Sequence, residues 1–236
     1  MLGDLTNDNR FRMRSTSVLL IILVAEALAA PQPQSPGDDG DHESIKYETV
    51  KEYEGYEERK YPSVKFVCTE LTYNIYEHSQ EESYMFYRLF SYISGVNSEN
   101  QTIEMTIPVI SKLAPKEYYH ITKEICFYLP SKFQDNPPKP TDKAVIIKKS
   151  NERVVFVKKV WGYAMTTDYV LMDTAASFFR ELEIAKRAEE IINGYFYTAG
   201  YDSRGTRYEV MVEKLQVASD ESKPSIPMPL LLSQEM

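Results

Sequence analysis

The sequence predicts an α+β fold built from two halves that share the order strand–helix–strand–strand. In each half, short segments with alternating apolar residues indicate strands. One longer segment, with apolar residues three to four positions apart, indicates a helix. The duplication exists at the level of pattern, because the halves share little residue identity. Two such halves would let two sheets curve together, with one helix packed on each.

The first half contains a predicted helix at residues 81–95, "EESYMFYRLFSYISG", in which Gly95 suits the C-terminal end. The strand before this helix would place Val64, Phe66 and Cys68 on one face, because side chains alternate along a strand. The strands predicted in this half are residues 56–71, 102–110 and 124–130.

The second half contains a longer predicted helix at residues 168–193. Asp168 is a suitable N-cap residue, and Gly194 lies just beyond the expected end. The strands predicted in this half are residues 152–164, 195–203 and 208–215.

The first thirty residues are predicted to lie outside the fold. The basic segment 10–14 precedes the apolar segment 15–30, which ends in small residues, and this pattern is typical of a secretory signal peptide. We therefore expect cleavage after Ala29 or Ala30 and a secreted, extracellular protein without stable membrane insertion. A buried helix and an uncleaved membrane anchor are the alternatives.

Composition suggests the remaining boundaries. A segment rich in Pro, Gly and acidic residues follows the signal peptide and predicts a disordered linker, in which His42 would be solvated. The start of translation, at Met1 or Met13, is left open. The expected parts are a signal peptide at 1–30, a linker at 31–45, a domain at 46–215 and a disordered tail at 216–236.

Entry into the secretory pathway gives meaning to two further features. Asn100-Gln101-Thr102 is an acceptor sequence for N-glycosylation in a polar turn, so we expect a glycan on Asn100. The chain has two cysteines, Cys68 and Cys126, and an even count favours a disulfide in an oxidising compartment. Each lies in an apolar strand, where a free cysteine is also at home, so both states stay open.

Charge and motifs exclude several functions. The net charge of −8 argues against a nucleic-acid-binding protein, which is usually basic. His42, His78 and His120 are the only histidines, and no pattern brings two of them together for a hydrolase. A glycine-rich phosphate loop, zinc-ligand spacing and a calcium loop are also missing from the sequence. We therefore expect a protein without enzymatic activity.

Four segments together resemble the SOUL/heme-binding-protein family: "YEERKYPSVKF", "RLFSYISGVN…QTIEMTIPV", "ICFYLPSKFQDNPPKPTD" and "FYTAGYDS". They follow the family's order and spacing from Tyr56 to Lys214. The resemblance implies a distorted antiparallel β-barrel of about eight strands with two helices, built from a duplicated half. It also implies a non-enzymatic protein that binds heme or a related porphyrin.

The sequence departs from the family at several positions. Lys60 stands where some relatives carry a histidine that would ligate heme iron. Arg88 and Ser91 match a basic pair that other relatives place near the heme propionates, so one cation is kept. Trp161-Gly162 replaces a Gly-Gly pair, and Met211 replaces a tryptophan. These changes bear on the ligand-facing region, and the fold inference survives them.

A heme site needs an apolar slot, cations for two propionates and, in some proteins, an axial ligand. His78 and His120 are expected to be ordinary surface histidines, and the alternative is that one of them is an axial heme ligand. Core packing is the alternative role for the helix residues, and a solvated rim is the alternative for the arginines. The candidates are Met85, Leu89 and Phe90 for the apolar wall, Arg88, Arg204 and Arg207 for propionates, and Tyr201 for hydrogen bonding or ligation.

Three hypotheses follow. The first, favoured by the resemblance, is an extracellular carrier or scavenger of heme or porphyrin. The second is a barrel that binds another amphipathic small molecule, with heme affinity lost through the changes at Lys60 and Ser91. The third is a glycosylated interaction protein that uses its acidic surface, rich in tyrosine (18 residues in the chain), to bind a protein partner.

Overall fold

The computed structural model describes residues 42–76, 81–161, 167–202 and 206–216, and everything below concerns these residues. They form two α-helices, α2 (Glu81–Ile93) and α3 (Asp168–Ile184), and two short 3-10 helices, Ser131–Phe133 and Ala188–Glu190. The strands are β1 (Glu48–Glu52), β2 (Glu57–Tyr61), β3 (Lys65–Asn74), β4 (Val109–Pro115), β5 (His120–Tyr128), β6 (Ile146–Lys149), β7 (Arg153–Trp161), β8 (Phe196–Gly200) and β9 (Arg207–Glu213).

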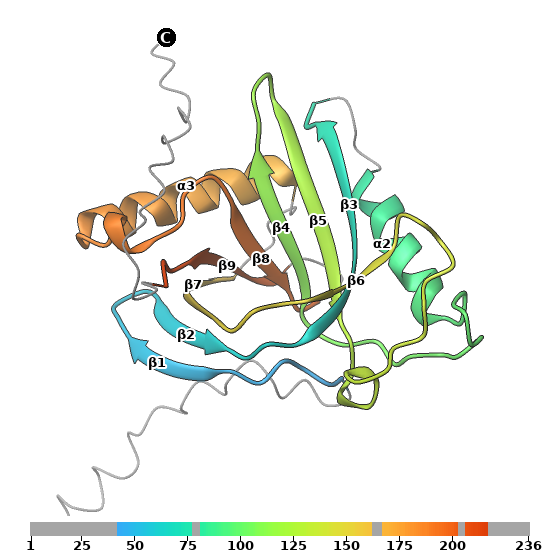
Figure 1. Cartoon of the computed structure of the whole chain (residues 1–236). Helices are drawn as coiled ribbons and strands as arrows, with labels where there is room; N and C mark the ends of the chain where they lie inside the picture. Colours follow the sequence, from blue (N-terminus) through green and yellow to red (C-terminus); the bar gives the residue numbers. More distant parts are fainter. Residues whose placement is uncertain (1–41, 77–80, 162–166, 203–205, 217–236) are drawn as a thin grey trace, which may run out of the picture. The chain divides into compact units, whose positions relative to one another are not determined.

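The predicted α+β class and the repeated order are confirmed. The first half is β3–α2–β4–β5 and the second is β7–α3–β8–β9. All nine strands belong to one sheet with antiparallel pairing, in the order β1-β2-β7-β9-β8-β4-β5-β3-β6. Helix α2 packs on β3 and β5, and α3 packs on β9 (Figure 1). Each helix therefore covers the strands of its own half.

The predicted closed barrel is not confirmed, because the recorded strand order has two ends, β1 and β6. Two pairings nevertheless follow one register. Tyr61 is opposite Arg153 in the β2–β7 pair, and Lys65 is opposite Lys149 in the β3–β6 pair. In both pairs the numbers of the two opposite residues add up to 214, so the same antiparallel alignment runs through both pairs.

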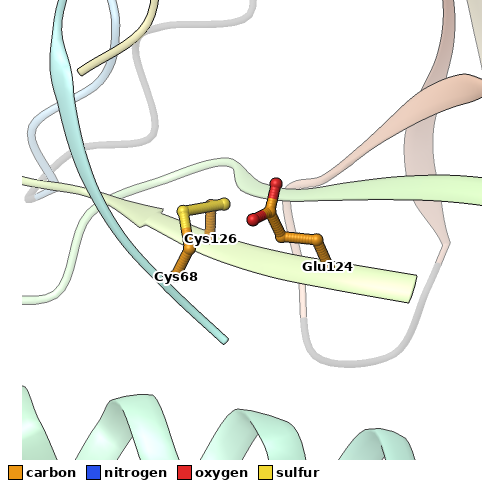
Figure 2. A group of neighbouring side chains, drawn as sticks. All are labelled: Cys68, Glu124 and Cys126. Atoms are coloured by element: carbon orange, nitrogen blue, oxygen red, sulfur yellow. A yellow bond between two sulfur atoms is a disulfide. The ribbon is translucent and has the colours of Figure 1, made fainter. Parts of the chain in front are cut away.

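A disulfide joins Cys68 of β3 to Cys126 of β5, where the two residues are directly opposite in register (Figure 2). Glu124 lies beside this bridge, and the potential ligand atoms of the three residues are within 4.8 Å of one another. Sulfurs bonded to each other are not thiolate ligands, and Glu124 forms an ion pair with Lys148. This group therefore gives no reason to infer a metal site.

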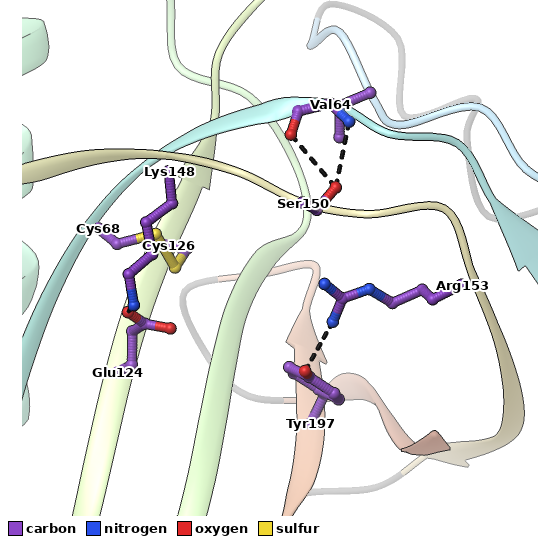
Figure 3. Close-up of a disulfide and its surroundings, with 8 residues drawn as sticks. All are labelled: Val64, Cys68, Glu124, Cys126, Lys148, Ser150, Arg153 and Tyr197. Carbon is purple, nitrogen blue, oxygen red and sulfur yellow. Dashed lines mark hydrogen bonds and ion pairs between the residues drawn. A yellow bond between two sulfur atoms is a disulfide. The ribbon is translucent and has the colours of Figure 1, made fainter. Parts of the chain in front are cut away.

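Val64 and Ser150 lie between the strands that follow this common alignment. The amide of Ser150 donates to the carbonyl of Val64 at 2.8 Å. Ser150 Oγ also accepts from the amide of Val64 at 3.1 Å and donates to its carbonyl at 3.2 Å (Figure 3). The hydrogen-bonded contact therefore continues across the break between β2 and β3 and the break between β6 and β7.

The second helix differs from its prediction at both ends. Thr167 is the N-cap residue, because its side chain accepts a hydrogen bond from the amide of Val170. Asp168 instead pairs with Lys123 at 2.7 Å. The helix ends at Ile184 rather than residue 193, because the chain then turns so that Ile191, 5% exposed, joins the core and pairs with Lys214.

Residues just before the predicted domain start at residue 46 also contact the domain. Ser44 forms a β-bridge with Ile107, and Ile45 is 7% exposed. His42 is exposed, but its ring nitrogen Nδ1 lies 3.1 Å from the carbonyl of Met105. An apolar side chain and backbone pairing therefore hold the end of the expected linker on the domain.

Other predicted strands need similar corrections. Residues 102–110 form a strand only from Val109 onward, and residues 56–71 form two strands rather than one. The break between β2 and β3 begins at Pro62, which has no backbone N–H to donate to a neighbouring strand. The predicted signal peptide, most of the predicted linker, His78, Arg204 and residues 217–236 lie outside the described residues.

Candidate ligand-binding site on helix α2

One face of α2 forms an open cavity of about 260 Å³ with the connection that joins β5 to β6. The helix supplies a tyrosine-rich wall, and the connection supplies an apolar wall with one carboxylate. The lining residues are Tyr84, Tyr87, Arg88, Ser91, Tyr92, Val96, Pro140, Asp142 and Val145.

Helical spacing explains this wall. Tyr84, Tyr87, Arg88 and Ser91 follow one another at intervals of three, one and three residues, so they share one face of α2. The buried residues Met85 and Leu89 occupy a different face of the same helix. The sequence of α2 therefore separates a face that packs on the sheet from one that lines the cavity.

Arg88 is the only cation among the lining residues. Its Nε lies 3.2 Å from Asp142, and its Nη1 donates to Thr69 of β3 at 3.1 Å. Its Nη2 donates to the hydroxyl of Tyr84 at 2.7 Å, and the guanidinium carbon lies 4.5 Å from the centre of the Tyr84 ring. Contacts from three elements hold this side chain, which is 15% exposed.

Hydrogen bonds attach the β5–β6 connection to the end of α2. The Tyr92 hydroxyl donates to the carbonyl of Pro138 at 2.7 Å, and burial raises the pKa of this phenol to about 12. The Ser98 amide donates to the carbonyl of Lys139 at 2.8 Å, and Thr141 Oγ1 donates to the carbonyl of Val96 at 3.2 Å. Two carbonyls and one side-chain hydroxyl of the connection therefore hold the second wall of the cavity.

Large apolar side chains are exposed around the cavity. Tyr84 is 57% exposed, Tyr87 64% and Val96 60%, while Phe90 on the same helix is 44% exposed. Clusters of exposed aromatic side chains beside a cavity are typical of a surface that binds a ligand or partner.

The structure brings only some of the predicted site residues together. Arg88 and Ser91 line the cavity. Met85 and Leu89 are 0% exposed in the core beneath α2, so they are not available to a ligand in this cavity. Phe90 is exposed on α2 but is not among the lining residues.

Tyr201 lies in a different, buried cluster around Arg59 of β2. Its hydroxyl donates to Glu209 at 2.9 Å, and burial together with that carboxylate raises the pKa of Tyr201. Arg59, 0% exposed, donates to Glu209 at 2.8 Å and also pairs with Glu57. Tyr201 is therefore a buried donor to Glu209 of β9, the carboxylate that also binds Arg59 of β2. The guanidinium of Arg207 lies 4.6 Å from the centre of the Tyr201 ring.

The other residues singled out from the sequence are also away from the cavity. Lys60 is on β2 and pairs with Glu152 at 2.9 Å. His120 is the first residue of β5, is exposed, and has Nδ1 3.0 Å from the carbonyl of Tyr118. Asn100 is exposed in the turn after α2, where a glycan would meet solvent.

A second polar group lies on the sheet in the other half. Tyr197 of β8 accepts a hydrogen bond from Arg153 at 2.6 Å (Figure 3). It also donates one to Glu213 at 3.1 Å. Burial raises the pKa of Tyr197 to about 12, although the charge of Arg153 opposes the shift. This group ties β7, β8 and β9 together.

The fold and the cavity define an α+β protein with an open, aromatic-walled pocket on α2. A sequence model of the SOUL heme-binding protein family matches residues 42–213, and the chain belongs to that family. Heme-binding protein 1 of Mus musculus is 31% identical over 170 residues, which cover 70% of this chain and 86% of the relative.

Heme-binding protein 2 of Homo sapiens is 31% identical over 182 residues, which cover 76% of this chain and 80% of the relative. Among solved structures, the C-terminal domain of EcmrR has a TM-score of 0.48 and 10% identity. This likeness covers 72% of this chain and 99% of that domain, but it is too weak to support an argument. Within the described residues, no helix has the length and apolar character needed to cross a membrane.

Sequence reasoning missed most of the cavity. The buried apolar face of α2 was predicted to contact the ligand. An apolar stripe alone does not show whether the sheet or a ligand packs against it. The tyrosines at positions 84 and 87 carried the better signal, since large aromatic residues on the polar face of a helix need an explanation. The partners of α2 in the β5–β6 connection follow it by about fifty residues, and no local pattern shows that pairing.

Proposed function

We propose that this chain binds heme or a related tetrapyrrole in the α2 cavity, without catalysing a reaction. The exposed aromatic wall beside Arg88 is the observation that carries the proposal, and membership of the SOUL family, with relatives named heme-binding proteins, supports it. A flat apolar macrocycle with carboxylate side chains matches a site that offers aromatic faces and one guanidinium.

The size of the cavity decides how such a ligand would be held. Cavities for drug-sized ligands have volumes of about 300–1,000 Å³, so the 260 Å³ available here suits one edge of a macrocycle. The remainder would rest on the exposed rings of Tyr87 and Phe90. Lys139 and Lys143 are exposed neighbours of the lining residues Pro140 and Asp142 and would meet the propionates at the rim.

Titration of the full chain, made in a secretory host, with hemin tests this proposal. We expect a saturable shift of the Soret band at one heme per chain. Tyr87→Ala should weaken binding roughly tenfold because it removes one aromatic face, as base-stacking losses of similar size suggest. Tyr169→Ala is the matched control, since Tyr169 is 62% exposed on α3 and away from the cavity lining.

Asp142→Asn tests the electrostatic part of the proposal. Its carboxylate pairs with Arg88 and would repel a propionate, so we expect the amide to strengthen hemin binding severalfold. A folded protein without saturable binding, or equal losses in the Tyr87 and Tyr169 variants, would contradict a heme site on α2.

We also propose three features that accompany this role. Secretion is supported by the signal-like pattern at residues 1–30, and a glycan on Asn100 is supported by its acceptor sequence and exposure. Lateral closure of the sheet into a distorted barrel is supported by the common register of the β2–β7 and β3–β6 pairs. Mass spectrometry of the secreted chain would detect the cleaved leader and the glycan.

A further inference from the structure

We propose that Tyr84 ligates the iron when ferric heme occupies the α2 cavity, and that Arg88 positions the ligating oxygen. This inference rests on the proposed function. It concerns a different property, because binding of the porphyrin ring and ligation of its metal can be measured separately.

The residue types in the cavity limit the choice of ligand. Proteins ligate heme iron through histidine, cysteine, methionine or tyrosine. Among the lining residues only the three tyrosines have one of these groups. Tyr92 is 1% exposed, and its hydroxyl is committed to the carbonyl of Pro138, so it cannot reach a ligand without breaking that contact. Tyr84 and Tyr87 remain.

Arg88 distinguishes these two tyrosines. The Tyr84 hydroxyl accepts a hydrogen bond from Arg88 Nη2 at 2.7 Å, with the guanidinium also stacked on the ring. In the described part of the chain, no hydrogen bond is found for the Tyr87 hydroxyl, and its ring contacts Phe86. Ligation of ferric iron by tyrosine would replace the phenol O–H bond with an iron–oxygen bond and release the proton to solvent. The hydrogen bond from Arg88 would hold the oxygen in position for this exchange.

Arg88 is itself held from two sides, by Thr69 of β3 and by Asp142 of the β5–β6 connection. Its hydrogen bond to Tyr84 is therefore directed by the sheet as well as by the helix. Tyr84 can keep this bond and still face a ligand, because it is 57% exposed and lines the cavity. An anionic oxygen ligand also favours ferric over ferrous iron, since it stabilises the higher charge.

The test compares hemin with metal-free protoporphyrin, using the full chain. We expect Tyr84→Phe to weaken hemin binding at least tenfold and protoporphyrin binding much less, because phenylalanine keeps the aromatic ring and removes only the ligating oxygen. Tyr169→Phe is the matched control and should leave both binding constants unchanged, since Tyr169 is exposed on α3 and away from the cavity lining. Resonance Raman spectra of the hemin complex should show iron–tyrosinate bands in the unmodified chain and in Tyr87→Phe, and none in Tyr84→Phe.

Arg88→Gln tests the positioning role. It should weaken or shift the tyrosinate bands and lower the affinity for hemin more than that for protoporphyrin. If wild-type chain binds both ligands and Tyr84→Phe keeps the hemin affinity and the spectrum, ligation by Tyr84 is wrong and the proposed function stands. If the folded chain binds neither ligand, both proposals fail together. Protoporphyrin binding by each variant also shows that its cavity has folded.

Discussion

The two halves of the repeat have the same order of elements, but their helices differ in what their second face contacts. Helix α2 buries one face on β3 and β5 and carries a cavity on another, where the β5–β6 connection lies against it. Helix α3 also buries one face, through Leu171, Ala175, Phe178 and Leu182. No described residue of α3 belongs to the cavity. The duplicated elements therefore supply a scaffold, and one long connection forms a cavity with the helix of the first copy.

The largest expected effects are losses of stability, which are measured separately from binding. Phe178→Ala should destabilise the fold by about 3–5 kcal/mol, because the ring is 0% exposed in the α3 core. Leu89→Ala, on the buried face of α2, should reduce the free energy of unfolding by about 2–5 kcal/mol. Urea unfolding measures both losses.

Hemin binding to the folded fraction then sharpens the comparison. Leu89→Ala should weaken binding because it loosens the wall of the cavity, and Phe178→Ala should leave the affinity unchanged. Equal losses of affinity would show that the halves are not functionally distinct.

The disulfide is expected to have the next largest effect. Cys68 and Cys126 are both in the first half and close a loop with a separation of 58 residues. Replacing both by serine should reduce the free energy of unfolding by about 2–4 kcal/mol, because the unfolded chain gains freedom. Identical urea midpoints for the unmodified chain with and without a reductant would show that the bridge does not stabilise the fold.

A smaller effect concerns alkaline pH. Burial raises the pKa of Tyr197, in the second half, from 10.0 to about 12. A raised pKa means that the folded state holds the proton more tightly. The resulting stability is therefore present below pH 10 and is lost as the pH rises from about 10 to about 12.

Tyr197→Phe should remove part of this pH dependence of unfolding, and Tyr92→Phe should remove a similar part in the first half. The ultraviolet absorbance of tyrosinate, followed together with circular dichroism, measures ionisation and unfolding in one titration. An unchanged slope between these pH values in both variants would contradict the assignment.

Much of the fold was predictable from the sequence because the elements that form the core have strong patterns. Helix α2 was predicted nearly to its ends, since its apolar residues follow the helical period and Gly95 adopts a positive φ of 108° after it. Strands β1 and β6 were missed for the opposite reason. Every residue of β1 is exposed, and β6 has three exposed residues out of four, so neither shows an apolar face.

The candidate site was less predictable. Arg88 and Ser91 were identified through the family resemblance, and both line the cavity. Met85 and Leu89 were chosen because they are apolar, but the same property places them in the core. Asp142 and Val145 meet α2 only through tertiary folding, so no local pattern could include them. Hydropathy thus predicts which residues are buried better than it predicts which residues meet a ligand.

The attachment of the β5–β6 connection has a consequence for how this family could diversify. Two of its hydrogen bonds, from the Tyr92 hydroxyl of α2 and from the Ser98 amide just after the helix, are accepted by the carbonyls of Pro138 and Lys139, and every amino acid has such a carbonyl. Side chains at these two positions can therefore change over generations without loss of these two bonds. Natural selection could in this way retune the cavity for new ligands while the supporting helix and sheet keep their sequence.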